Sequence, residues 1–317
     1  MRNPGDFLLS ERSPRVRGTA TYTKPALSED ALLDRWVERG LILQDRERVR
    51  RYLRHIGYYR LSGYVRSFEE DGQRPRIRPG TTFDDALGLY VFDRKLRLVM
   101  LDALERVEVA VRAAMSDQMS RLGGPHWYED PQYFSQSAIH RRLLKTVDDL
   151  VEDQLKRPAE KAAGQESSVS ALDHYVTRYG EPVRPPTWLA FEELSLGSLR
   201  SVYGCLANQS VKADIAVSVG LRAPVLASWL QTYQRVRNIC AHHGRLWNRG
   251  LGVYPMIPTS RSIRWLVESD LFTREPWRRQ RLYPVIVSLQ TVLHTIAPGS
   301  SWAGRLRQAI QEHPAVP

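Results

Sequence analysis

The side chains best suited to chemistry lie together in the segment RVRNICAHHGRLWNR, residues 235–249. Its polar members are Arg235, Arg237, Asn238, His242, His243, Arg245 and Arg249. In a helix, Asn238 and His242 are four residues apart on one face, and the longer Arg237 side chain can reach round toward the same imidazole. An imidazole gains and loses a proton near neutral pH, and a guanidinium binds phosphate oxygens. This combination predicts acid–base chemistry at a phosphate group.

Cleavage of RNA without a metal ion needs only these groups. The imidazole takes the proton of the ribose 2′-hydroxyl, and the cationic donors stabilise the charge that develops at phosphorus. DNA lacks that hydroxyl and is therefore not cleaved. The alternative is structural, because histidines and arginines in the last turn of a helix also cap carbonyls and pair with acids. Zinc is disfavoured, since Cys240 and His242 point in different directions on a helix.

A second group of polar residues lies in a long apolar helical run. Glu105, Glu108 and Arg112 are spaced three and four residues apart, and therefore share one helical face. The favoured interpretation is a ladder of ion pairs worth about 0.2–0.5 kcal/mol each. In the functional interpretation, Glu108 or Arg112 faces the site of Arg237 and His242 and sets its charge state.

Basic residues are concentrated in the C-terminal quarter, where the chain from Thr232 onward carries twelve arginines and only four acidic residues. Such a surface attracts polyanions through phosphate contacts and counterion release. The residues predicted to contact RNA are Arg245, Arg249, Arg274, Arg278, Arg279 and Arg281. A chain-wide preference for arginine is the alternative explanation, because only six of the 46 basic residues are lysines.

The composition indicates a packed globular protein. Of 317 residues, 42% are hydrophobic and 26% charged, and the formal net charge is +11. The two cysteines, Cys205 and Cys240, have no metal-binding or redox spacing, which predicts buried thiols in a reducing cytoplasm. We therefore expect no metal and no cofactor. The first 18 residues lack the apolar core of a secretion signal, so we expect a cytoplasmic protein without a membrane partner.

Helical periodicity recurs along the chain and strand patterns are nearly absent, so the predicted fold class is all-α. We expect a flexible basic arm over residues 1–24, an N-terminal helical segment over 25–80 and a helical core over 81–317. Within the core, the run from Phe83 to Leu122 contains no proline and one early glycine. At 1.5 Å per residue it would extend roughly 60 Å, so we expect a kink or two consecutive helices.

Capping residues predict where several helices begin. Ser28 precedes the first helical run, and Thr82 forms a capping box with Asp85 ahead of the long run. Glycines at 40 and 57 are expected to end the first two helices. Further helices are expected over residues 137–157, 168–179, 208–218, 223–243, 276–297 and 302–311. The helix over 223–243 would carry Arg237 and His242.

Residues 237–242, RNICAH, fit the Arg-x4-His motif, with a polar residue after the arginine, of HEPN-type ribonucleases. The larger pattern resembles the bacterial abortive-infection proteins of the AbiD/AbiF group. The resemblance lies in the segments KPALSEDALLDRW, YYRLSGY, FDRKLRLVMLDALERVEVAVR, RNICAHHGRLWNR and RLYPVIVSLQTVL. Together they span about residues 24–300 in this order, which is more specific than the single motif.

The resemblance implies a HEPN-like helical bundle core with additional N-terminal helices, and a phage-defence or toxin effector that cleaves RNA to a 2′,3′-cyclic phosphate. By that resemblance Arg237 and His242 are the catalytic pair and Asn238 orients them, while we expect His243 to position or cap. Such sites are commonly composite, and the chain contains only one convincing copy of the motif, so we expect a homodimer. An antitoxin protein or a small RNA is a candidate restraining partner. The alternative function is a non-catalytic RNA-binding regulator or scaffold of a defence system.

Overall fold

The computed structural model describes residues 17–70, 76–156, 170–260, 262–266 and 274–313. Over these residues the chain is helical, without a β-strand and with only isolated bridges, which confirms the predicted all-α class. Two compact units divide between Ala86 and Leu87, a few residues beyond the boundary expected at residue 80. The predicted N-terminal arm lies mostly outside the described residues, and its described part, 17–24, is exposed and non-helical.

The first unit contains three short helices that begin and end at locally encoded signals. These are α1 (Glu29–Glu38), α2 (Arg46–Ile56) and α3 (Tyr58–Val65). The side chain of Ser28 caps α1 by accepting a hydrogen bond from the Ala31 amide, as predicted. Gly57 adopts a φ of 91°, which lets α2 end and α3 start at a single residue. The indole of Trp36 is fully buried and stacks on Tyr58 with ring centroids 4.8 Å apart.

Helix α4 (Phe83–Gly123) runs for 41 residues as one helix, so the expected alternative of two consecutive helices is wrong. Its capping box forms as predicted: Thr82 donates its amide to the Asp85 carboxylate at 2.8 Å, and Asp85 donates its amide to the Thr82 hydroxyl at 3.2 Å. Buried residues recur along its length at helical spacing, from Phe92 to Met119. This continuous packing stabilises a helix far longer than local propensity alone would favour.

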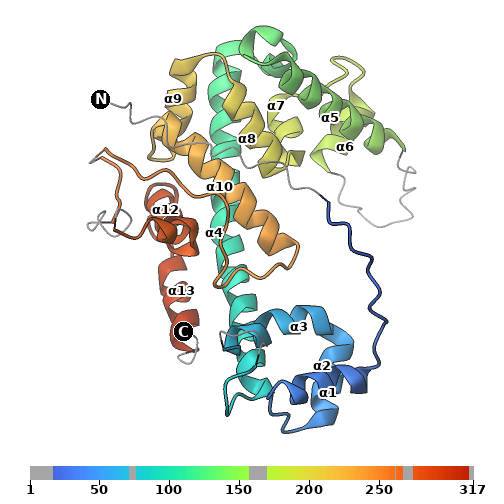
Figure 1. The fold of residues 1–317 in the computed structure, drawn as a ribbon. Coiled ribbons are helices and arrows are strands. Elements are labelled where there is room, and N and C mark those ends of the chain that lie inside the picture. The colour runs from blue at the N-terminus through green and yellow to red at the C-terminus, as the bar shows by residue number, and fades with distance from the viewer. Residues whose placement is uncertain (1–16, 71–75, 157–169, 261, 267–273, 314–317) are drawn as a thin grey trace, which may run out of the picture. The chain divides into compact units, whose positions relative to one another are not determined.

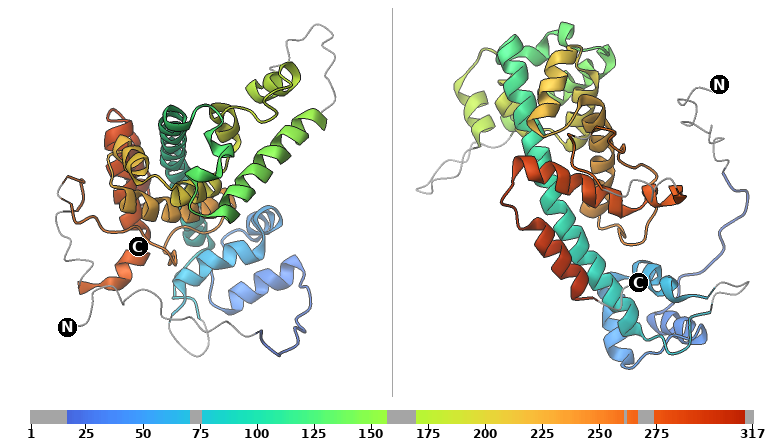
Figure 2. Two further views of the ribbon diagram at one scale, coloured as in Figure 1. Left: turned by 90° about the horizontal axis from the view of Figure 1, so that it is seen from above. Right: turned by 90° about the vertical axis from the view of Figure 1, so that its left-hand side faces the viewer.

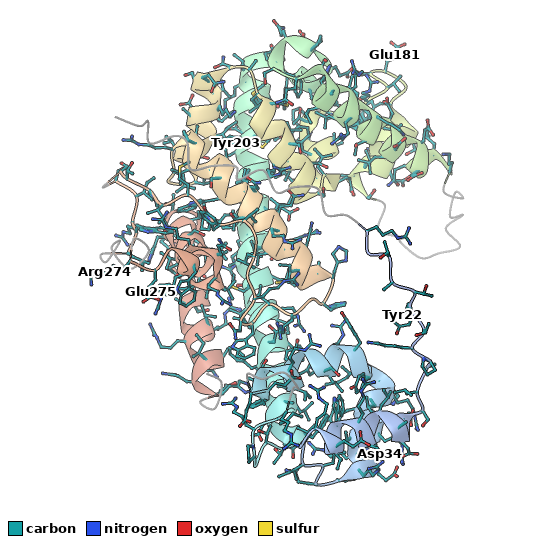
Figure 3. All side chains as sticks on the ribbon, in the orientation of Figure 1. Tyr22, Asp34, Glu181, Tyr203, Arg274 and Glu275 are labelled. Carbon is teal, nitrogen blue, oxygen red and sulfur yellow. The ribbon has the colours of Figure 1, made fainter. Side chains whose placement is uncertain are left out.

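The second unit packs the remaining helices around the later turns of α4 (Figure 1). They are α5 (Ser137–Lys156), α6 (Ala171–Arg178), α7 (Thr187–Ala190), α8 (Leu196–Cys205), α9 (Gln209–Ser218), α10 (Ala223–Ala241), α12 (Leu282–Ile296) and α13 (Trp302–Gln311). Short 3-10 turns join some of them: η2 (Trp127–Glu129), η3 (Pro131–Tyr133), η4 (Phe191–Glu193) and η5 (Pro276–Gln280). Tyr203 of α8, labelled in Figure 3, is fully buried beneath these elements.

Helix α13 lies along α4, although about 200 residues separate them in the sequence (Figure 2). The Trp302 indole donates a hydrogen bond to the Val99 carbonyl at 2.7 Å, and Arg305 pairs with Asp102 at 2.7 Å. Among the described helices, none alone is long and apolar enough to cross a membrane. Only α9 and α10 taken together, with 65° between them, reach the required length and apolarity.

Candidate active site

The proposed catalytic segment is the C-terminal end of α10 and the loop that follows it. The helix ends at Ala241 with His242 as its C-cap, and His243 adopts a left-handed φ of 56°. The amides of His243 and Gly244 donate to the carbonyls of Cys240 at 3.0 Å and Ile239 at 2.8 Å, which closes the helix end. The expectation that helix continues through residue 243 is therefore wrong. His243 turns away in the loop instead of following His242 round the helix.

The buried face of α10 determines which side chains remain accessible. Val236, Ile239 and Cys240 are buried, and burial raises the pKa of the Cys240 thiol to about 12, as expected of an unreactive core cysteine. Arg237 and Asn238 are half-buried, whereas the His242 imidazole is exposed. The helix thus presents the three proposed catalytic side chains at the edge of the core, where a large substrate can approach.

A buried carboxylate on α4 holds the loop after His242. Asp93 has no exposed surface, and its Oδ1 accepts hydrogen bonds from the amides of Leu246 at 3.0 Å and Trp247 at 2.6 Å. Its other oxygen forms an ion pair with Arg97, which is itself 5% exposed. The guanidinium of Arg97 in turn lies 3.4 Å from the Gly244 carbonyl. The two residues therefore connect α4 to the backbone directly beyond the end of α10.

Sequence reasoning missed Asp93 and Arg97, although a signal was present. Both lie in the apolar stripe of the long helix, in register with Leu89, Leu96 and Met100. A charged pair in such a stripe is buried only if its hydrogen-bonding capacity is satisfied, which predicts a specific polar partner from elsewhere in the chain. The partner is the 244–247 loop.

Two basic segments separated in sequence come together beside this loop. The Arg281 guanidinium donates to the Asn248 side chain at 3.0 Å, and the Leu251 amide donates to the Gln280 carbonyl at 3.0 Å. Arg274 and Glu275, which come a few residues before Gln280 in the sequence, are labelled in Figure 3. The predicted arginines near the end of α10 and those near residue 280 therefore belong to one surface.

An aromatic residue that sequence reasoning missed lies within that surface. Trp277 in η5 is 53% exposed, and the guanidiniums of Arg278 and Arg281 lie 5.2 and 5.3 Å from its ring centroid. An exposed indole beside cationic groups is a suitable platform for a nucleic-acid base. The sequence feature that could have identified Trp277 is its position directly before Arg278 and Arg279.

Of the other predicted RNA contacts, Arg274 is exposed and the remaining arginines are half-buried. Arg245, Arg249 and Arg279 are half-buried, and Arg249 donates to the Arg245 carbonyl at 3.4 Å. Arg278 pairs with Glu275 at 2.5 Å, so part of its charge is already neutralised within the chain.

Glu108 and Arg112 form an ion pair at 3.1 Å, whereas Glu105 is exposed. Arg112 also donates to the Leu194 carbonyl at 3.1 Å, directly before the first turn of α8. Among the described residues, no hydrogen bond or ion pair joins Glu108 or Arg112 to Arg237 or His242. Helix α8, which begins just after Leu194, packs against α10. No group of three or more potential metal-ligating side chains occurs in the part of the chain that the structure describes.

Comparison with protein families identifies the class to which this fold and site belong. Residues 51–248 match the model of the Abi-like protein family. The match covers more than half of the chain and includes both Asp93 and the whole of α10, so the chain belongs to the Abi-like family. Membership associates it with abortive infection, a form of phage defence. Searches of curated proteins and of solved structures find no match.

Proposed function

We propose that this Abi-like protein is a metal-independent, HEPN-type endoribonuclease that acts in abortive infection. The observation that carries the proposal is the end of α10, where Arg237 and Asn238 lie in the last turns of the helix and the exposed His242 is its C-cap. These residue types match an Arg-x4-His site. The alternative, a non-catalytic RNA-binding regulator, uses the same basic surface without the chemical step.

The proposed reaction proceeds by attack of a ribose 2′-hydroxyl on the adjacent phosphorus. A neutral His242 imidazole takes the hydroxyl proton, the new 2′-oxygen–phosphorus bond forms, and the 5′-oxygen leaves with a proton supplied by a second group. The products are a 2′,3′-cyclic phosphate and a 5′-hydroxyl end. Arg237 neutralises the charge that develops on the phosphoryl oxygens. Asn238, one turn from His242, orients the imidazole or the phosphate.

Incubation of the purified protein with total RNA in the presence of EDTA tests the proposal directly. We expect discrete cleavage products with cyclic phosphate ends, and we expect the His242→Ala variant to produce none. Binding of RNA without cleavage by the wild-type protein would favour the regulator instead.

A nuclease that is toxic to its own cell is expected to need restraint in uninfected cells, for which an antitoxin protein or a small RNA is the candidate partner.

The proposed site requires a homodimer, because one chain supplies one copy of the Arg237 and His242 pair and the reaction needs both a base and an acid. A two-fold interface brings identical surfaces together and would place two copies of Arg237 and His242 on opposite sides of one phosphate. Mixing excess His242→Ala chains with wild-type chains should lower activity per wild-type chain if both copies share one site. Unchanged activity per wild-type chain, or an active monomer, would contradict the shared site.

RNA binding is expected to depend on the surface around Trp277. The Arg281→Gln and Trp277→Ala variants should each weaken binding of single-stranded RNA, about 1–3 kcal/mol being typical for loss of a stacked aromatic. Only Arg281→Gln should also reduce the slope of log affinity against log salt, by about 0.7 for one lost phosphate contact. Fluorescence anisotropy over a salt series measures both quantities. Equal salt slopes for Arg281→Gln and wild type would remove Arg281 from the phosphate contacts.

A further inference from the structure

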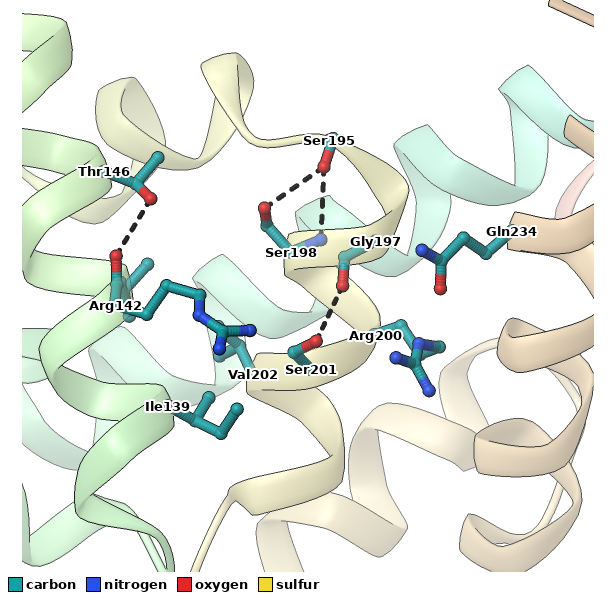
Figure 4. A pocket seen from close by; sticks show the side chains of 11 residues that line it. Ile139, Arg142, Thr146, Ser195, Gly197, Ser198, Arg200, Ser201, Val202 and Gln234 are labelled. Atoms are coloured by element: carbon teal, nitrogen blue, oxygen red, sulfur yellow. Dashed lines mark hydrogen bonds between the residues drawn. The ribbon is translucent and has the colours of Figure 1, made fainter. Parts of the chain in front are cut away.

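A pocket of about 300 Å³ lies between α5, α8 and α10, and none of the proposed catalytic residues lines it. Figure 4 shows Arg142 of α5 and Arg200 of α8 on opposite sides of the α8 serines, with Gln234 of α10 on a further wall. No carboxylate is among the described residues that line it. The pocket therefore has two positive charges and no acidic side chain to balance them.

The arginines of this pocket have unused hydrogen-bonding capacity. Neither Arg142 nor Arg200 forms an ion pair with any residue in the described part of the chain. The Nε of Arg200 is shielded from solvent and has no hydrogen-bond partner there. No hydrogen bond to a described residue occupies the remaining guanidinium nitrogens of either arginine, so these donors can serve an external acceptor.

The neighbouring polar groups favour an anion over a cation. The hydroxyls of Ser201 and Thr146 donate to carbonyls of their own helices at 2.9 Å each. The hydroxyls of Ser195 and Ser198 lie 3.1 Å apart, so one proton is used between them and the other can be donated into the pocket. Two guanidiniums, one hydroxyl and the Gln234 amide are donors that together suit a phosphate group.

Gln234 connects the pocket to the proposed active site. A Cβ added at Gly197 would lie 2.6 Å from the Gln234 Nε2, so the absence of a side chain at Gly197 lets the amide approach α8. Asn238 is one turn further along α10 and His242 two turns further, at about 6 and 12 Å along the axis. In a stacked strand with about 3.4 Å per nucleotide, 12 Å corresponds to three or four nucleotides.

We propose that this pocket, formed by Arg142, Arg200, Gln234 and the α8 serines, binds a backbone phosphate of the RNA strand a few nucleotides from the bond held at His242. The proposal rests on the proposed function for its choice of RNA. The pocket volume is at the lower end of the range for small-molecule sites and suits a phosphate with its ribose. Bound there, the phosphate would fix the position of the strand along α10.

The test measures binding of a labelled single-stranded RNA to the full chain carrying His242→Ala, so that cleavage cannot interfere. Arg142→Gln and Arg200→Gln should each lower affinity about tenfold or more, because a charge-assisted hydrogen bond is lost. Each should also reduce the salt slope by about 0.7. Arg141→Gln is the matched control, since Arg141 is an exposed neighbour on α5 outside the pocket. Arg142→Lys and Arg200→Lys should recover part of the affinity, provided that all variants unfold at the same denaturant concentration.

The position of the bound phosphate is tested by replacing one RNA phosphate at a time with a neutral methylphosphonate. Replacement of one particular phosphate should weaken RNA binding by the His242→Ala chain. The same replacement should not further weaken RNA binding by the chain that also carries Arg142→Gln. If Arg141→Gln lost as much RNA affinity as Arg142→Gln and Arg200→Gln, the proposal would be overturned. Binding of inorganic phosphate or a nucleoside monophosphate in the pocket, with RNA affinity unchanged in the variants, would overturn it in favour of a small ligand.

The failures of the two proposals can be told apart. If the wild-type chain binds RNA through the pocket but does not cleave it, the phosphate site is supported and the nuclease proposal is wrong. If cleavage depends on His242 but affinity does not depend on Arg142 or Arg200, the nuclease proposal is supported and the phosphate site is overturned.

Discussion

Replacing His242 with alanine is expected to reduce RNA cleavage by about 10²–10⁴-fold, the usual loss when a general acid–base group is removed. Arg237→Ala is expected to reduce it by about 10²–10³-fold through loss of charge stabilisation. Because both groups act in one step, the double variant should be no less active than the poorer single variant. His242 is exposed, so its replacement should alter stability by no more than about 0.5 kcal/mol. Rates on a defined RNA, with unfolding curves for each variant, measure these effects.

The neighbouring histidine provides the control. His243 has a φ of 56°, a conformation that asparagine tolerates and that alanine adopts only with strain. His243→Asn therefore removes the imidazole with little change in the backbone, and its effect on cleavage should be much smaller than that of His242→Ala. Full activity of the Arg237→Ala or His242→Ala variant would refute the catalytic assignment.

Removal of the Asp93 carboxylate is expected to cause the largest loss of stability, about 3–5 kcal/mol for Asp93→Ala. The change leaves Arg97 buried without its partner and the amides of Leu246 and Trp247 without an acceptor. Asp102→Ala is the matched control on the same helix. Its pairs with Arg106 and Arg305 are more exposed, so it should cost only about 0.2–1 kcal/mol. Urea unfolding measures the difference.

A double variant separates stability from positioning of the loop. Arg97→Leu combined with Asp93→Ala removes the uncompensated charge and should recover part of the lost stability. It does not restore an acceptor for the Leu246 and Trp247 amides, so we expect both Asp93→Ala and the double variant to cleave RNA more slowly than the wild-type protein. Recovery of both stability and cleavage would show that Asp93 only compensates Arg97 and does not position the loop beyond His242.

Local signals in the sequence predicted much of the secondary structure correctly. Ser28 and the pair of Thr82 and Asp85 cap helices in the structure as their types and spacing indicated. These interactions join residues three apart, so they depend only on the neighbouring sequence. The uninterrupted length of α4 could not be predicted in this way, because the side chains that pack against it come from distant segments such as the one containing Trp302.

The sequence by itself determined that Arg237, Asn238 and His242 lie close together, because the last turns of one helix carry Arg237 and Asn238 and His242 is the C-cap of the same helix. Only the tertiary structure decided how the chain leaves that helix and what surrounds it. Asp93 meets the 244–247 loop across about 150 residues of sequence, Arg281 meets Asn248, and three helices supply the pocket around Arg200. Such contacts arise when apolar faces of separate helices pack and bring polar groups together, and no short-range pattern specifies which groups will meet.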